Sequence, residues 1–206
     1  MAEGLNRGII ARERLNYIVK EIFRKSIHIC SSIVPFFLER FYKPVIFILI
    51  FAVTAYSVSE LLRLKGHSIP VISKITEIAA RKRDENKFVL GPVTLVLGIL
   101  LAAIFLPLDC ARVGIFALAF GDGLASLGGK LFGKVTIPGA HGKTVAGSLT
   151  CFTAVYISTF CASSSCFVSL VVATFAMFIE VLPITDFDNL IIPIATGSLY
   201  KILLTI

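Results

Sequence analysis

The chain has 206 residues, of which 56% are hydrophobic, and a formal net charge of +7. So apolar a composition excludes an ordinary soluble domain, because the apolar residues fall in blocks long enough to cross a bilayer. The basic excess lies between these blocks, as in membrane proteins, and predicts no nucleic-acid partner. The five cysteines form no C-x-x-C pair, so a zinc site has little support.

The first residues, 5 to 20, are amphipathic and are expected to lie at the membrane surface. They lack the compact apolar core and cleavage site of a removed signal peptide. We predict an all-α membrane protein, a multi-pass bundle of about seven transmembrane helices in a single domain, residues 1–206. The predicted spans are residues 22–38, 44–64, 88–107, 111–127, 144–161, 167–182 and 190–204.

A polar, basic segment, residues 65–87, separates the second span from the third. It predicts an interfacial helix around residues 69–80, followed by the basic cluster 81–83. These three cations are either solvated or attracted to anionic lipid headgroups.

A cytoplasmic N-terminus is predicted from the distribution of Lys and Arg. With that orientation all of them fall on the cytoplasmic side except Arg40, Lys43, Arg112 and Lys201, as the positive-inside rule requires. The same orientation brings acids from several segments to the cytoplasmic boundary of the membrane. Because carboxylates are costly in lipid, we predict that they form a site: Glu60, Asp122, Glu180, Asp186 and Asp188.

The stretch from Phe120 to Ser148 combines one carboxylate, Asp122, with three lysines and many glycines. An acid for a metal, bare backbone amides and lysines for phosphate are the groups that a Mg–nucleotide site needs. The stretch is not a Walker A loop, since Ile137 stands where the first glycine should be. The alternative is a basic membrane loop whose glycines pack helices.

Two pairs of charged residues near predicted spans each have two possible roles. Arg24 and His28 share one helix face and either snorkel to the interface or reach toward phosphate. Glu60 and Arg63 lie one turn apart, so they either pair with each other or face the same site.

The motifs resemble those of the CTP-dependent lipid kinases, a family that includes dolichol kinase, phytol kinase and fungal-type diacylglycerol kinase. The resemblance covers most of the chain in the expected order. The family pattern G-D-x-x-A-x-x-x-G-x-x-x-G-K is matched from Gly121 to Lys134, and K-T-x-x-G-S/T from Lys143 to Ser148. The family's late pattern has an acid before a proline, followed by D-N-L-x-x-P. It is matched by Glu180, Pro183 and residues 188–193. R-K-x-x-H and E-x-x-R resemble Arg24-Lys25-x-x-His28 and Glu60-x-x-Arg63.

The resemblance implies transfer of the γ-phosphoryl group of CTP to the hydroxyl of a membrane lipid alcohol: a polyprenol or dolichol, a phytol-like alcohol or diacylglycerol. The residues suit this chemistry, since phosphoryl transfer needs positioning and charge neutralisation. Asp122, Glu180, Asp188 and Asn189 are the predicted Mg²⁺ ligands, and Glu60 or Asp188 is the predicted base. The predicted nucleotide and phosphate site comprises Gly121, Gly129, Lys130, Gly133, Lys134, Lys143, Thr144, Ser148, Arg24 and His28.

Two other functions compete with the kinase. A phosphatidate cytidylyltransferase also uses CTP, Mg²⁺ and a membrane lipid, but its closing D-R-x-D signature is absent. An ion-coupled transporter would also place acids in the membrane, yet the chain has no related halves. The expected location is a bacterial inner membrane or an endoplasmic-reticulum-type membrane, with the active site on the cytoplasmic face. The sequence leaves the oligomeric state open.

Overall fold

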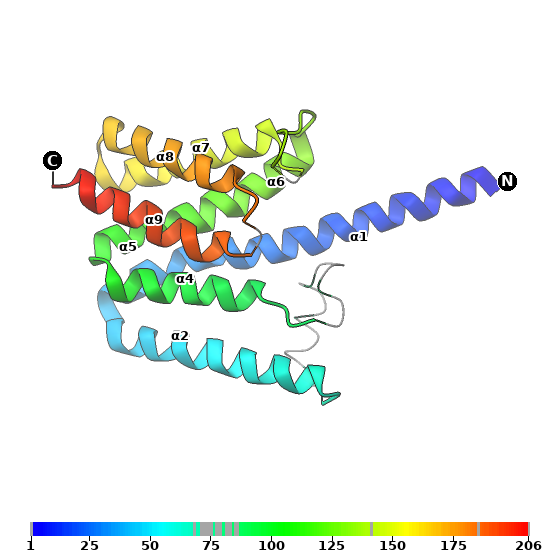
Figure 1. Cartoon of the computed structure of the whole chain (residues 1–206), viewed down its shortest axis with the longest axis horizontal. Helices are drawn as coiled ribbons and strands as arrows, with labels where there is room; N and C mark the ends of the chain where they lie inside the picture. The colour runs from blue at the N-terminus through cyan, green and yellow to red at the C-terminus, as the bar shows by residue number, and fades with distance from the viewer. Residues whose placement is uncertain are drawn as a thin grey trace.

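A computed structural model describes the protein over residues 2–67, 69–70, 76, 80, 84, 87–140, 142–184 and 186–205, without the side chains of residues 2–11, 13, 14 and 17. The described elements are helices, which confirms the all-α prediction. They lie side by side in a bundle, and the N-terminal part of α1 projects beyond it (Figure 1).

The first two predicted spans lie in one nearly continuous helical run that reverses direction. It consists of α1 (Ala2–Cys30), the 3-10 turn η1 (Ser31–Ile33) and α2 (Val34–Leu64). Phe41 inside α2 has non-helical dihedral angles, φ −135° and ψ 51°, three residues before Pro44. Proline lacks an N–H and clashes with the preceding turn, so the helix breaks there. The chain then runs back along the bundle (Figure 1).

The next helices form the centre of the bundle. α4 (Gly91–Phe105) ends before Pro107, and α5 (Leu108–Phe116) begins directly after it. α5 continues through a π-helical stretch, η3 (Ala117–Asp122), into α6 (Gly123–Phe132). The fourth span was predicted to end near residue 127 with a glycine–lysine loop after it. That boundary is wrong, because residues 128–130 belong to α6.

The remaining helices are α7 (Val145–Ser163), α8 (Cys166–Val181) and α9 (Asp188–Leu203). The hydroxyl of Thr144 accepts a hydrogen bond from the Gly147 amide and caps α7. The Ser165 hydroxyl caps α8 in the same way, and Ser164 supplies the left-handed residue that ends α7.

Two glycines let α9 lie directly on the central helices. A Cβ at Gly98 of α4 would lie 2.1 Å from the Asn189 carbonyl oxygen, and a Cβ at Gly114 of α5 would lie 2.1 Å from that of Pro193. Small residues at such contacts allow helix backbones to approach closely. This packing holds the first turn of α9, including Asp188 and Asn189, against α4.

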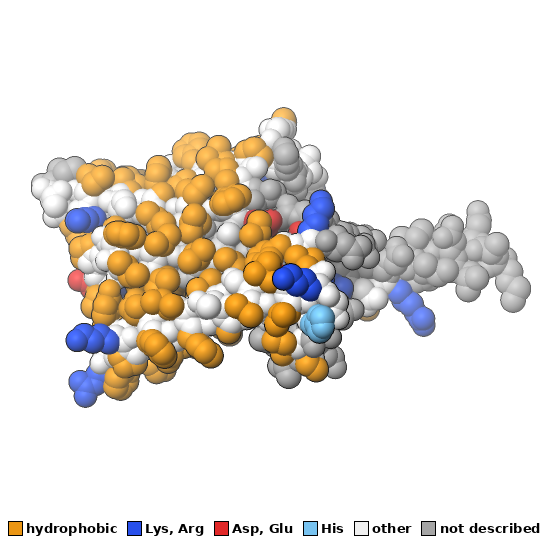
Figure 2. Space-filling view, turned by 60° about the horizontal axis from the view of Figure 1, so that its bottom comes forward, with side chains coloured by type: hydrophobic (Ala, Val, Ile, Leu, Met, Phe, Trp, Pro, Cys, Tyr) orange, Lys and Arg blue, Asp and Glu red, His pale blue; other side chains and the backbone are white. Residues whose placement is uncertain are grey.

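Within the described residues, three helical stretches are long and apolar enough to cross a membrane: Ile18–Leu64, Leu108–Phe132 and Val145–Ser163. Gly91–Phe105 and Cys166–Val181 are shorter apolar helices. Hydrophobic side chains cover much of the outer face drawn in Figure 2. These features indicate an integral membrane protein. The basic cluster 81–83 and most of the predicted interfacial helix at 69–80 lie outside the described residues.

Candidate active site

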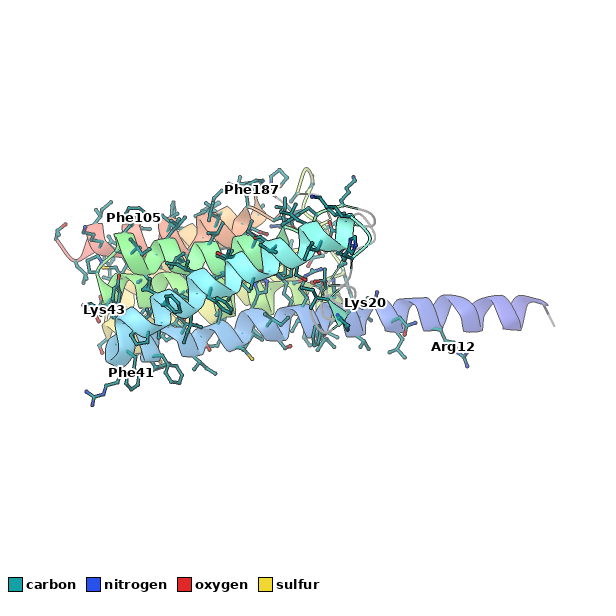
Figure 3. All side chains as sticks on the ribbon, turned by 90° about the horizontal axis from the view of Figure 1, so that it is seen from below. Arg12, Lys20, Phe41, Lys43, Phe105 and Phe187 are labelled. Atoms are coloured by element: carbon teal, nitrogen blue, oxygen red, sulfur yellow. The ribbon has the colours of Figure 1, made fainter. Side chains whose placement is uncertain are left out.

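A cavity of about 210 Å³ lies where α1 meets the rest of the bundle. Its lining comes from α1, α2, α4, η3, the start of α9 and two described residues of the segment 65–87, Thr76 and Asp84. Figure 3 shows side chains with oxygen and nitrogen atoms inside the bundle near Lys20. The cavity therefore joins segments that are far apart in the sequence.

The charged centre of this cavity is a cluster of Lys25, His28 and Asp122, named here the cavity triad. Lys25 Nζ donates a hydrogen bond to Asp122 Oδ2 at 2.5 Å, and His28 Nδ1 lies 3.0 Å from the same oxygen. The three residues are only 3%, 5% and 7% exposed. A buried carboxylate needs a cationic partner such as Lys25 at this distance, because its desolvation is costly.

The local backbone explains how Asp122 reaches this position. It is the last residue of the π-helical stretch η3. Such stretches are rare and occur frequently at functional sites, since the wider turn changes where side chains point. The next residue, Gly123, allows α1 to approach, because a Cβ there would lie 3.1 Å from Ile29 Cγ1.

A second cavity carboxylate, Asp188, begins α9. Its Oδ1 accepts a hydrogen bond from the Asn189 amide at 2.9 Å, and it forms no ion pair among the described residues. Burial, followed by the negative charge of Asp122, raises the pKa of Asp188 to about 6. The Asn189 side chain donates to Thr94 Oγ1 at 3.1 Å, so it also fixes α9 to α4.

Glu60 does not line the cavity, although it is only 2% exposed. Its carboxylate accepts two hydrogen bonds from Arg63, at 2.7 and 2.8 Å, and one from the Val89 amide at 2.8 Å. Arg63 also donates to the Lys87 carbonyl at 2.8 Å. This group, the loop anchor, fastens the chain before α4 to the end of α2.

Lys143 and Glu180 pair with each other outside the cavity. Lys143 Nζ lies 3.4 Å from Glu180 Oε1 and donates a hydrogen bond to the Glu180 carbonyl. Ser148 Oγ donates to Glu180 Oε2 at 3.3 Å. The connection between α6 and α7 also has an internal hydrogen bond, from the Ile137 amide to the Lys143 carbonyl at 2.8 Å. These contacts join that connection to α8.

The predicted nucleotide-binding glycines lie at helix contacts. A Cβ at Gly129 would lie 2.9 Å from Thr144 Oγ1, and one at Gly133 would lie 2.5 Å from it. At Gly121 a Cβ would lie 2.8 Å from Val155 Cγ2. These spacings are those of closely packed helices, the alternative left open by the sequence.

Two predicted phosphate-binding cations contact Glu21 of α1. Arg24 Nη2 lies 2.5 Å from Glu21 Oε2, and Lys130 Nζ lies 2.7 Å from it. The same carboxylate also accepts a hydrogen bond from the Ser126 hydroxyl. Arg24 lines the cavity, Lys130 does not, and Lys134 is exposed on the surface.

The cavity thus unites six of the predicted site residues: Arg24, His28, Asp122, Asp186, Asp188 and Asn189. The others lie outside its lining: Glu60, Gly121, Gly129, Lys130, Gly133, Lys134, Lys143, Thr144, Ser148 and Glu180. Sequence reasoning did not assign a role to Lys25, which contacts Asp122, although Lys25 stands inside the R-K-x-x-H match. Its position one turn before His28 was the available signal.

The carboxylates suit a magnesium–nucleotide complex. Mg²⁺ prefers hard oxygen ligands and is usually held by one or two carboxylates together with substrate phosphates. Asp122 and Asp188 line the same cavity and supply such oxygens. Within the described part of the chain no three His, Cys, Asp or Glu residues gather as a metal site, and a complex completed by phosphates does not need three.

Two known proteins are similar to the chain. CTP-dependent diacylglycerol kinase 1 of Saccharomyces cerevisiae is 27% identical over 147 residues, which cover 69% of this chain and 51% of that protein. Phytol kinase 1, chloroplastic, of Arabidopsis thaliana is 29% identical over 201 residues, which cover 88% of this chain and 66% of that protein. No protein-family model and no solved structure matches. The chain is a distant homologue of these two lipid kinases, one of them CTP-dependent by name, and spans between about half and two thirds of the two proteins.

Proposed function

We propose that the protein is a membrane-embedded lipid kinase that transfers the γ-phosphoryl group of CTP to the hydroxyl of a membrane lipid alcohol. The observation that carries this proposal is the cavity triad beside Asp188: cations and carboxylates buried together in one cavity of an apolar helical bundle. Phosphoryl transfer requires this combination of fixed positive and negative charge. The distant homology to lipid kinases supports it.

Asp122 is the proposed ligand of Mg²⁺, while Asp188 is kept for the base; the ion when bound would neutralise the charge of the transferring phosphate. Arg24 and Lys25, one turn from His28 on α1, are the proposed phosphate contacts. Lys25 is held at 2.5 Å from Asp122, so its ammonium is already ordered before any phosphate binds. An oriented cation of this kind needs little reorganisation in the transition state.

Asp188 is the proposed base that accepts the hydroxyl proton of the alcohol. Its raised pKa of about 6 gives a carboxylate that is ionised at neutral pH yet more basic than an ordinary Asp. Glu60 is less suitable, because Arg63 and the Val89 amide already occupy its carboxylate. We therefore favour Asp188 where the sequence left both open.

Lys143 remains a proposed phosphate contact, together with the amides at the start of α7. A helix N-terminus attracts anions, and Thr144 already caps that helix. Reaching a phosphate would require Lys143 to exchange Glu180 for it. The glycines at 121, 129 and 133, with Lys130 and Ser148, then act by shaping and holding this region, whereas Lys134 is exposed on the surface and does not line the cavity. Glu180 and Asn189 act in the same way rather than as metal ligands.

The proposed topology has seven spans, a cytoplasmic N-terminus and the active site on the cytoplasmic side, where nucleotide is supplied. The turn at Ser164 then faces the opposite side. Labelling of a Ser164→Cys variant from each side of the membrane tests this arrangement, in a background where Cys161 and Cys166 are replaced. Reaction only from the cytoplasmic side contradicts it.

Product analysis tests the activity itself. Purified protein in vesicles is given a lipid alcohol and CTP labelled at either the γ or the α phosphorus. Label in the lipid extract from the γ position alone is the expected result. Label from the α position alone identifies a cytidylyltransferase, and label from neither contradicts both. Competition between CTP and ATP in the same assay tests the choice of nucleotide.

A further inference from the structure

The cavity has a second kind of lining beside its charged groups. Ile27, Val89, Pro92, Leu95 and the ring of Tyr56 form an apolar wall. The Tyr56 hydroxyl is already engaged, since it donates a hydrogen bond to the Val89 carbonyl at 3.3 Å. Such a wall does nothing for the phosphates of a nucleotide, which need cations and amides. It is suited to hydrocarbon.

The position of this wall connects the cavity with the outer, apolar surface. α1 packs against α6 and η3, whereas α2 packs against α4. The cavity is lined from both groups of helices and so lies between them. Ile27 lines the cavity and is also 37% exposed, so it stands at the margin. Leu90, next to Val89, is 41% exposed and continues the apolar surface outward.

From this arrangement we infer that the gap between α1 and the α2–α4 pair binds the hydrocarbon chain of the lipid alcohol. The inference rests on the proposed kinase function. The chain lies along Ile27, Pro92 and Leu95, and its hydroxyl points toward Asp122 and Asp188. The alcohol thus reaches the phosphate without leaving apolar surroundings.

The apolar wall also indicates the class of alcohol. A diacylglycerol carries two ester groups close to its hydroxyl, and burying them without hydrogen-bond donors is costly. The side chains of Ile27, Val89, Pro92 and Leu95 offer no donors. At the charged end of the cavity the donors are already engaged, Lys25 by Asp122, Arg24 by Glu21 and Asn189 by Thr94. A single-chain alcohol, such as an isoprenoid with no polar group besides its hydroxyl, buries only hydrocarbon there. We therefore assign the site to single-chain alcohols.

A narrowing substitution tests the site. Ile27→Trp adds bulk at the margin of the cavity, and Ile157→Trp makes the same change on α7, where Ile157 is 57% exposed and does not line the cavity. For Ile27→Trp we expect kcat/KM for a single-chain alcohol to fall about tenfold or more, the effect of steric change in an apolar pocket. The KM for CTP should stay unchanged. Ile157→Trp should behave as the unaltered protein.

Binding without turnover gives a second readout. Ile27 is replaced by p-benzoylphenylalanine, the protein is placed in vesicles with a chain-labelled isoprenoid alcohol and no nucleotide, and the sample is irradiated. Labelling should be saturable and displaced by excess unlabelled alcohol, but not by dioleoylglycerol. The same replacement of Ile157 should give only labelling that excess alcohol does not displace.

The outcomes separate this inference from the kinase proposal. If the unaltered protein transfers no γ label to any lipid, the kinase proposal fails. If it does transfer label, while Ile27→Trp leaves kcat/KM for lipid unchanged or raises only the KM for CTP, the kinase stands and the lipid site is overturned. Displacement of the label by dioleoylglycerol, with faster turnover of that lipid, overturns the single-chain assignment.

Discussion

Asp122 and Glu60 are two buried carboxylates that each pair with a cation, but their surroundings differ. Asp122 contacts Lys25 and His28 and lines the cavity. The oxygens of Glu60 are occupied by Arg63 and by the Val89 amide, away from the cavity. Burial and a charged partner therefore do not separate a proposed metal ligand from a structural carboxylate. Access to a cavity distinguishes the two.

The largest effect is expected from removing the charge of Asp122. Asp122→Asn keeps the size of the side chain but loses the charge that would hold a cation, so kcat should fall about 100-fold or more. Turnover is measured per folded molecule, with thermal unfolding as the reference.

Because Asp122→Asn leaves Lys25 buried without its anion, stability should fall too. The double variant Lys25→Met, Asp122→Leu removes both charges and should recover stability without recovering turnover. If the folded Asp122→Asn protein turned over normally, Asp122 would be structural and the contrast with Glu60 would disappear.

A smaller effect is expected from Lys143, which contacts Glu180 outside the cavity. If Lys143 exchanges Glu180 for a phosphate, Lys143→Ala removes a charge-assisted contact worth about 1.5–3 kcal/mol, and kcat/KM for CTP should fall about 10- to 100-fold. The apparent affinity for lipid should not change. Glu180→Gln is the matched variant: it frees Lys143 from the carboxylate and should not weaken CTP binding. A defect of Lys143→Ala seen only against lipid concentration contradicts the assignment.

Glu60 should behave in the opposite way from Asp122. Glu60→Gln weakens its hydrogen bonds with Arg63 and the Val89 amide, so the free energy of unfolding should fall by about 1.5–3 kcal/mol. Turnover per folded molecule should be unchanged. Thermal unfolding and kcat on the same samples provide the measurement, and a large loss of kcat in a stable Glu60→Gln protein would restore Glu60 as a base.

The smallest change is a pH dependence from Asp188. Its pKa is raised from 3.8 to about 6, so activity that needs the ionised form should rise between pH 5 and about 7. The pH dependence of stability runs in the opposite direction. The folded state favours the protonated form of Asp188, so the stability of the protein should fall as pH rises from 3.8 to about 6. Profiles of kcat and of thermal unfolding test both. In Asp188→Asn the stability slope should vanish, and its persistence would assign the titration to another group.

The sequence alone was sufficient for features that depend on neighbouring residues. Apolar blocks predicted the helices, and two predicted span bounds coincide with Pro44, near the reversal, and with Pro107, at a helix boundary. The pairing of Glu60 with Arg63, three residues apart, could be expected for the same reason. Such contacts follow from helix geometry and need no knowledge of the fold.

Only the tertiary structure decided which charges share a cavity. Lys25 and Asp122 are 97 residues apart, and Lys143 and Glu180 are 37 apart, so no local pattern pairs them. The glycines at 129 and 133 suited phosphate binding and helix packing equally well until Thr144 was found against them. Helix periodicity determines which face of a segment is apolar. The packing of the helices against one another determines which polar groups come into contact. That packing depends on the whole chain.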